Sequence, residues 1–200
     1  RKRDVMFVLE TTRRFSVVAL ARPARQRAPL AAAEGDPALY VKLTALFDGR
    51  GVVYEELAHE ATLTSEASVA ARVAGGWRDT TLASGAKAML MRHSKNGDFL
   101  LCVLAADRKL DWKLLRKVVA KDLRLATEDE VLHLARCLPG AVPPFGSQFF
   151  ATPPPRTFMD ASLAHLSDIN FNCGLRTRSV RMSLAAYVAL EAPTAVEISR

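Results

Sequence analysis

The sequence is poor in the residues that build metal sites and disulfide frameworks. It has only three cysteines and four histidines, with neither a CxxC pair nor metal-ligand spacing among them. An odd, scattered set of cysteines indicates a reducing compartment, so we expect a cytoplasmic protein with no structural metal and no cofactor. No apolar run approaches the ~18 residues that cross a bilayer, so we expect no membrane span.

The motifs of several enzyme classes are also missing. The chain has no GxSxG nucleophile elbow, no GxxxxGK[ST] phosphate loop and no GxGxxG that opens a helix. Cys137 and Cys173 remain as possible nucleophiles, but a free cysteine is more often a small buried hydrophobe, which we expect for both. The sequence therefore predicts neither triad chemistry nor nucleotide binding through a glycine-rich loop.

The composition is that of a globular domain with excess positive charge. Half of the residues are hydrophobic, 24% are charged, and the net charge is +7. This balance favours an acidic partner such as nucleic acid. We divide the chain into a basic arm with a Pro/Ala/Arg-rich linker (1–35), one folded domain (36–192) and a C-terminal tail (193–200).

The arm itself allows two interpretations. Its arginine-rich, acid-poor composition loosely resembles an organelle transit peptide, although an unstructured basic arm is the simpler view. Because the chain starts at Arg1 rather than Met, we expect a fragment. Within the arm, residues 17–20 are a weak strand candidate.

Hydrophobic periodicity predicts a mixed α/β domain. Helices are expected where a capping residue precedes a helical pattern, at Asp36-Pro37, Thr64 or Ser65, Asp111, Thr127 and Ser183. In the second helix, Val69, Ala70 and Val73 form the expected buried face. Strands are expected at residues 52–57, 86–92, 99–105, 123–126, 157–159, 169–172 and 179–182. Strict βαβ alternation is absent, which argues against a doubly wound sheet.

Two stretches are the candidate functional elements. Residues 138–146 hold three prolines and two glycines in nine residues, yet they are apolar, as expected of a stiff pocket wall. Gly140 leaves its backbone open to approach. In residues 83–92, Lys87 interrupts an apolar strand and shares one face with Met89 and Met91. Its ammonium either reaches bulk water or points into a pocket, and the neighbouring loop favours the pocket.

Basic side chains form two groups. The first follows Asp111 and holds Lys113, Arg116, Lys117 and Lys121, with Arg108, Lys109 and Arg124 beside it. The second holds Arg176, Arg178 and Arg181. Each group alone is explained by a solvated surface, but two groups bracketing one candidate site favour contact with a phosphate backbone.

These features resemble the YbaK/ProX family of aminoacyl-tRNA editing domains. The family includes free-standing deacylases and the editing insertion of bacterial prolyl-tRNA synthetases. The residues that carry the resemblance are 84–87 (Ser-Gly-Ala-Lys), the apolar strand at Phe99, 123–130, the GxxxP loop 140–146, 171–174 and 179–183. The resemblance covers residues 37–190.

The resemblance implies a fold and a mechanism. The expected fold is a mixed sheet of six to seven strands, curled toward a barrel, with helices outside. The expected activity is hydrolysis of the ester of mischarged tRNA without a metal or a side-chain nucleophile. Lys87 would hold the phosphate or carbonyl region of the tRNA end. Gly140 and Ala141 of the loop would present backbone N–H groups to the ester carbonyl, Pro144 would complete the GxxxP motif that shapes the loop, and the ribose hydroxyl would help to place the water.

The remaining site residues combine this resemblance with the loop, the strand, a helix N-terminus and the basic groups described above. Substrate contacts are expected from Val142, Pro143, Met89, Asn172, Gly174 and Thr64. Contacts to tRNA are expected from Lys113, Arg116, Lys117, Arg176 and Arg178. Ala88 and Asn172 stand where the alanine-specific branch has Asn and His, so alanine specificity does not carry over.

The expected substrate is tRNA(Pro), or a related tRNA, that carries an amino acid the size of Ala, Ser, Cys or Thr. An aminoacyl-tRNA synthetase, in cis or in trans, is a possible partner. The alternative interpretation is a catalytically silent tRNA-binding module of a synthetase or synthetase complex.

Overall fold

The computed structural model describes residues 36–200, so the arm and the strand candidate at residues 17–20 lie outside the described part. The helices are α1 (Ala38–Gly49), α2 (Ser65–Ala74), α3 (Trp112–Val118), α4 (Glu128–Ala135) and α5 (Leu184–Glu191). The strands are β1 (Tyr54–Ala58), β2 (Ala86–His93), β3 (Phe99–Ala105), β4 (Leu123–Leu125), β5 (Arg156–Asp160), β6 (Asp168–Asn172), β7 (Arg178–Ser183) and β8 (Thr194–Val196).

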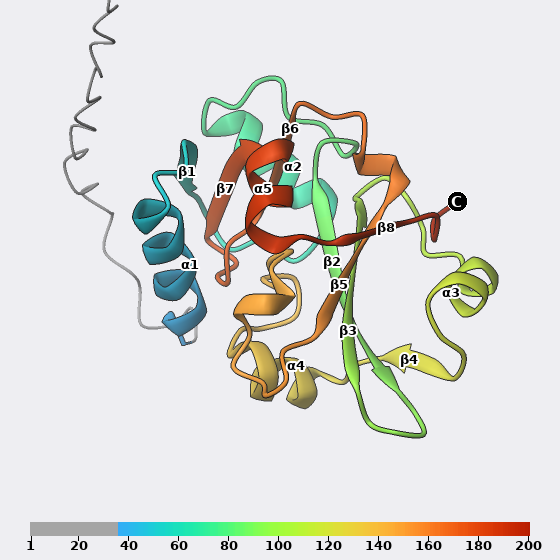
Figure 1. Cartoon of the computed structure of the whole chain (residues 1–200). Coiled ribbons are helices and arrows are strands. Elements are labelled where there is room, and N and C mark those ends of the chain that lie inside the picture. Colours follow the sequence, from blue (N-terminus) through green and yellow to red (C-terminus); the bar gives the residue numbers. More distant parts are fainter. Residues whose placement is uncertain (1–35) are drawn as a thin grey trace, which may run out of the picture.

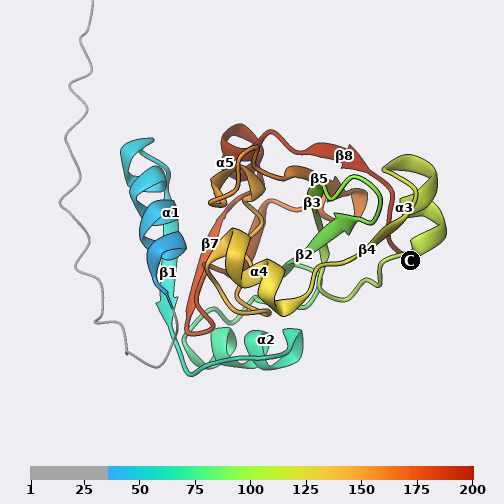
Figure 2. The same ribbon diagram turned by 90° about the horizontal axis from the view of Figure 1, so that it is seen from below.

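The mixed α/β class expected from the sequence is confirmed, but the strands form two sheets rather than one. One sheet has the order β1-β7-β6, and the other has the order β4-β2-β3-β5-β8. A bridge between Gly85 and Asn170 joins them (Figure 1). In the part of the chain that the structure describes, neither sheet closes into a barrel. Helices α1 and α3 lie at opposite ends of the molecule (Figure 2).

Local sequence signals account for the helix starts. Asp111 accepts hydrogen bonds from the N–H groups of Lys113 and Leu114, and Thr127 forms a capping box with Glu130. These bonds satisfy N–H groups that have no partner inside the helix. Asp36 accepts from the Ala38 N–H at 2.9 Å at the start of α1. The caps at Thr64, Asp111, Thr127 and Ser183 are therefore confirmed, whereas the N-cap of α1 is Pro37, one residue after the expected Asp36.

The apolar loop forms part of the core. Phe145 is fully buried, and its ring centroid lies 5.3 Å from that of Phe47, 5.6 Å from that of Phe171 and 5.3 Å from that of Tyr187. Burying a phenylalanine side chain stabilises a fold by ~1.5–3 kcal/mol. This anchor holds the loop against α1, β6 and α5.

The C-terminal tail expected at residues 193–200 is instead a packed edge of the larger sheet. Strand β8 pairs in parallel with β5, and the Ile198 side chain is fully buried. The reason lies in Asp160, whose carboxylate accepts hydrogen bonds from the Ile198 N–H and the Ser199 hydroxyl, both at 2.7 Å. So short a segment shows no period that would identify it from sequence.

Helix α2 buries a different face from the one predicted. Val73 is 39% exposed, whereas the buried residues of the helix are Ser68 and Arg72. The Arg72 side chain donates to acceptors on β6 and β7, and the Ser68 hydroxyl donates to the Thr64 carbonyl. The apolar periodicity in this helix was therefore misleading.

Candidate functional site

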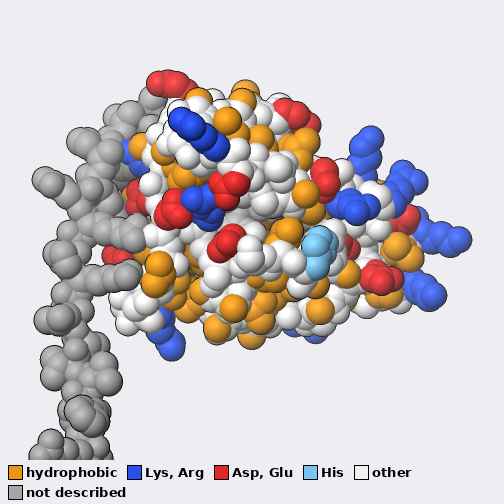
Figure 3. All heavy atoms as spheres, turned by 90° about the horizontal axis from the view of Figure 1, so that it is seen from above, with side chains coloured by type: hydrophobic (Ala, Val, Ile, Leu, Met, Phe, Trp, Pro, Cys, Tyr) orange, Lys and Arg blue, Asp and Glu red, His pale blue; other side chains and the backbone are white. Residues whose placement is uncertain are grey.

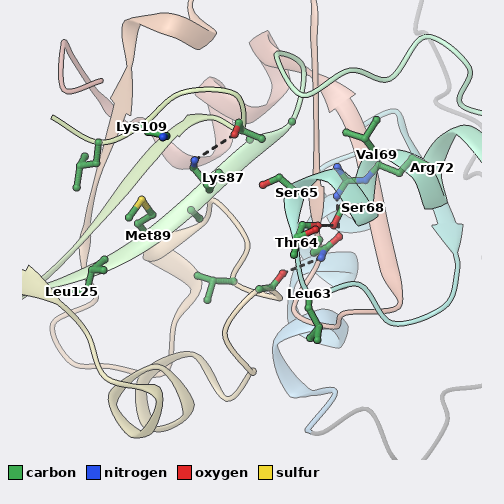
Figure 4. A pocket seen from close by; sticks show the side chains of 18 of the residues that line it. Leu63, Thr64, Ser65, Ser68, Val69, Arg72, Lys87, Met89, Lys109 and Leu125 are labelled. Atoms are coloured by element: carbon green, nitrogen blue, oxygen red, sulfur yellow. Dashed lines mark hydrogen bonds between the residues drawn. The ribbon is translucent and has the colours of Figure 1, made fainter. Parts of the chain in front are cut away.

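A cavity of about 500 Å³ opens beside the free edge of β2. Strand β4 pairs with residues 91–93 of β2, so within residues 36–200 the first half of β2 has no strand beside it on that side. The cavity lies between this edge, the N-terminal part of α2 and the 138–146 loop (Figure 4). Its size lies within the usual range for ligand pockets.

Lys87 and Met89 line the cavity from β2, but so do Ala86 and Ala88, because the cavity borders the edge of the strand rather than one face. Met91, which shares the predicted face, is fully buried and does not line it. Lys87 is partly buried, and its Nζ donates to the backbone carbonyl of Arg108 at 2.6 Å and to that of Ala106 at 3.4 Å. Burial lowers the pKa of Lys87, and the charges of Asp107 and Glu66 partly oppose that shift. The loop after β3 therefore holds the ammonium at the edge of the cavity (Figure 4).

The 138–146 loop contributes fewer atoms to the cavity than expected. Gly140, at φ +86°, and Val142 line it. The Ala141 N–H is already bonded to the Leu138 carbonyl at 2.9 Å, so it cannot also donate to a substrate in this conformation. Pro143 and Pro144 are buried and lie behind the lining. Their part is to stiffen the loop, because proline fixes φ.

Asn172 lines the cavity and Gly174 does not. The Asn172 Nδ2 donates to the Gly140 carbonyl at 2.9 Å, which ties β6 to the loop. Gly174 instead faces α1, where an added Cβ would lie 3.0 Å from the Tyr40 nitrogen. With φ at +78°, this position needs glycine for backbone shape and close approach. Gly174 is therefore a packing residue and not a substrate contact.

Arg72 lines the cavity, although it was not identified from the sequence as a site residue. Its side chain is 4% exposed, and its guanidinium donates to Ser179 Oγ at 2.9 Å, Asn170 Oδ1 at 2.6 Å and Asn172 Oδ1 at 2.8 Å. Burial lowers the pKa of Arg72 to about 10. The available signal was spacing: Ser65, Ser68 and Arg72 fall on one side of a helix, at i, i+3 and i+7.

The N-terminus of α2 completes the wall. Thr64 is the N-cap, and its hydroxyl accepts from the Ala67 N–H at 3.1 Å. Thr64, Ser65 and Ser68 all line the cavity, and Figure 4 shows them on the side opposite Lys87 and Met89. The α2 side of the cavity therefore carries several polar side chains beside the apolar Leu63 and Val69.

Comparison with known proteins assigns the family. Residues 59–190 match the model of the aminoacyl-tRNA editing domain. The chain is 32% identical, over 164 residues, to the multifunctional Ser/Thr-tRNA deacylase ProXp-y of Escherichia coli K12, covering 80% of this chain and 92% of that protein. The chain belongs to the aminoacyl-tRNA editing-domain family. As a member of it, the protein is an aminoacyl-tRNA hydrolase.

Solved structures show the same fold. The editing domain is similar to the hypothetical protein APE2540, with a TM-score of 0.68 and 19% identity, over 80% of this chain and 99% of that one. It is also similar to a candidate trans-editing enzyme for prolyl-tRNA synthetase, with a TM-score of 0.66 and 20% identity, over 80% and 96%. These structures confirm the fold, and the family model and the E. coli relative confirm the family expected from the sequence.

The two basic groups of the editing domain lie in different surroundings. Lys113, Arg116 and Lys117 on α3 are exposed, and Lys and Arg side chains gather at that end of the molecule (Figure 3). Arg176 instead donates to the Pro139 carbonyl at 2.9 and 2.7 Å, and Arg178 is 4% exposed. Of the two predicted groups, the α3 group is therefore the more exposed, whereas Arg176 and Arg178 bind backbone carbonyls.

Three further features concern the cysteines, metal ligands and membrane-spanning helices. The cysteines are free and buried, and burial raises the pKa of Cys137 to about 12, which keeps the thiol protonated. Among residues 36–200, no cluster of three His, Cys, Asp or Glu side chains is placed to hold a metal ion. No helix in the same range is both long and apolar enough to span a bilayer.

Proposed function

We propose that this editing domain hydrolyses the ester of tRNA(Pro), or a related tRNA, mischarged with serine or threonine, and that it does so without a metal ion. The observation that carries the proposal is the cavity, which is lined by Lys87 and Gly140 and by the polar side chains of Ser68, Arg72 and Asn172. The activity named for the E. coli relative supports the choice of hydroxyl amino acids.

The proposed mechanism depends on positioning. An aminoacyl ester is already activated, so a correctly placed water supplies much of the rate. The Lys87 ammonium, held by the carbonyls of Ala106 and Arg108, binds the terminal phosphate or the ester carbonyl. The Gly140 N–H donates to the carbonyl oxygen as negative charge develops there. The ribose hydroxyl of the tRNA orients the attacking water.

The proposal also includes the cellular compartment and the partner of the protein. We place the activity in the reducing cytoplasm, which suits three free cysteines, and beside an aminoacyl-tRNA synthetase that produces the mischarged tRNA. The exposed α3 cations would hold the acceptor end of the tRNA next to the cavity, since Lys109 and Trp112, at the start of this segment, line it.

A deacylation assay tests the proposal. Ser-, Thr-, Ala- and Phe-tRNA are each incubated with the protein in single-turnover experiments, with and without EDTA and with Mg²⁺ restored for tRNA folding. We expect hydrolysis of the seryl and threonyl esters that does not depend on any other divalent ion. Preferential hydrolysis of the phenylalanyl ester would contradict the small pocket. Binding of tRNA without hydrolysis of any ester would show a binding module.

A further inference from the structure

Arg72 is a buried cation that has no carboxylate partner. Its side chain is 4% exposed, and no Asp or Glu among residues 36–200 lies within 4.0 Å of the guanidinium. The surrounding acceptors are two amide oxygens and one hydroxyl, all neutral. Burying a charge without a counter-charge costs stability. A position that carries this cost needs an explanation beyond packing.

The hydrogen-bond count of Arg72 is incomplete. A guanidinium carries five N–H groups and no acceptor. Three of them are used, by Ser179, Asn170 and Asn172. The described residues provide no acceptor for the other two, which belong to a side chain that lines the cavity. Arg72 therefore lines the cavity with two N–H groups that have no partner among the described residues.

Both sides of the cavity combine polar and apolar side chains. The α2 side carries Ser65, Ser68, Val69 and Arg72, and the other side carries Lys87, Met89, Lys109 and Leu125. The two groups face each other across the space (Figure 4). A pocket that selected its ligand by size alone would need no charged donor. A buried donor at Arg72, with apolar Val69 and Met89 also lining the space, fits a ligand with a small apolar body and a hydrogen-bonding group.

We propose that Arg72 is a specificity residue that donates a hydrogen bond to the side-chain hydroxyl oxygen of a seryl or threonyl ester. This inference rests on the function proposed above and deepens it. The bond distinguishes Thr from Val, which has the same shape, and Ser from Ala. It also distinguishes Ser from Cys, because a thiol sulfur is a weak acceptor. The editing domain thus selects the hydroxyl and not only the size of the amino acid.

The expected discrimination is large because an unsatisfied pocket penalises the wrong substrate. A site built to bond a hydroxyl rejects the analogue without it by up to ~10⁴–10⁵-fold, whereas an apolar pocket separates such isosteres by only ~10²-fold or less. This cavity is open, so water can occupy part of it beside a valyl group. We therefore expect Thr-tRNA to be hydrolysed at least ~10²-fold faster than Val-tRNA.

A second role for Arg72 predicts a different result. Arg72 donates to Asn172, and Asn172 donates to the Gly140 carbonyl, so the arginine also supports the loop. If that were its whole contribution, its removal would slow every ester by the same factor. The ratio of the Thr and Val rates separates the two roles, because only a contact to the hydroxyl changes it.

The experiment measures single-turnover hydrolysis of Thr-tRNA and Val-tRNA on the same tRNA body. It uses the unchanged protein, Arg72→Met and Arg72→Lys, with thermal melting of each. Arg72→Met should lower the Thr/Val ratio at least ~10-fold, mainly by slowing Thr-tRNA. Arg72→Lys keeps the positive charge but not the forked geometry of the guanidinium, so it should lower the Thr/Val ratio by a smaller factor. If the Met variant does not fold, the Lys variant provides the test.

The control is Arg181→Gln. Arg181 lies on β7, donates to Glu55 and Asp79, and does not line the cavity, so its loss should leave the ratio unchanged. A Thr/Val ratio near one in the unchanged protein, or equal slowing of both esters in the folded Arg72 variants, overturns the inference. Hydrolysis of neither ester, nor of Ser-tRNA, by the unchanged protein overturns the proposed function instead.

Discussion

Helices α2 and α3 both border the cavity and both carry basic residues, but they use them in opposite ways. Helix α2 turns Arg72 inward, against Asn170, Asn172 and Ser179. Helix α3 buries Leu115 and leaves its cations in water. The difference arises from what each helix packs on: polar side chains of β6 and β7 lie under α2, whereas the apolar cluster around Ile198 lies under α3.

This contrast separates recognition from attachment. A buried donor has fixed partners and a low local dielectric, so its remaining bonds are directional and strong. Exposed cations attract a polyanion without defining which atoms it must present, and salt screens them. The α2 wall therefore suits selection of the amino acid, and the α3 surface suits affinity for the tRNA backbone.

The largest effect should come from Lys87, which stands between the two helices. Lys87→Ala should slow single-turnover hydrolysis by ~10²–10³-fold, because a misplaced ester loses both orientation and carbonyl stabilisation. The melting temperature should change little, since the substitution removes a partly desolvated charge whose bonds go only to backbone carbonyls.

The control for this prediction is Lys95→Ala. Lys95 is an exposed residue in the turn of the same hairpin and pairs with Asp122 at 2.8 Å. Near-normal hydrolysis by Lys87→Ala would remove Lys87 from the site. Lys87→Arg should not restore the full rate, because the planar guanidinium does not fill the space of a compact ammonium.

Charge reversal on α3 should have an intermediate effect. Changing Lys113, Arg116 and Lys117 to Glu should lower kcat/KM at least ~10-fold at low salt, while the rate with saturating tRNA stays close to normal. Each lost phosphate contact should lower the slope of log affinity against log salt by about 0.7–0.9. Tight tRNA binding with an unchanged salt slope would show that the tRNA binds to another surface. The control is Arg50→Glu, which reverses an exposed charge at the end of α1.

The smallest effect should come from the cap of α2. Thr64→Ala removes the acceptor for the Ala67 N–H and should lower the free energy of unfolding by ~1 kcal/mol. Because the first turn of α2 lines the cavity, hydrolysis should also fall a few-fold. Ser183→Ala removes the equivalent cap from α5, which does not line the cavity, and should affect stability alone. Equal effects of the two variants on the rate would contradict the distinct role of α2.

The parts of the site that were predicted correctly depend on local signals. Lys87 and Met89 share a side of β2 because side chains alternate along a strand, and α3 begins at Asp111 because an aspartate caps the chain there. The loop was recognised from proline, glycine and apolar residues in one short stretch. In each case the signal lies within a few residues of the feature.

The parts that were predicted incorrectly depend on distant partners. Arg176 and Arg178 were expected at the surface, but Arg176 binds the Pro139 carbonyl and Arg178 lies in the interior. Gly174 was expected in the pocket, but its lack of a side chain serves the contact with α1. An arginine or a glycine has the same local pattern in either setting.

The sequence by itself determined the family, the capped helices, the strands and the lysine at the pocket. Each of these depends on residue type and spacing within a short stretch of the chain. Only the tertiary structure decided that the strands form two sheets, that residues 193–200 pack against β5, and that Arg72 belongs to the site. Arg72 is buried because acceptors from β6 and β7, about 100 residues later, come to lie under α2. Such an arrangement exists only after the chain has folded.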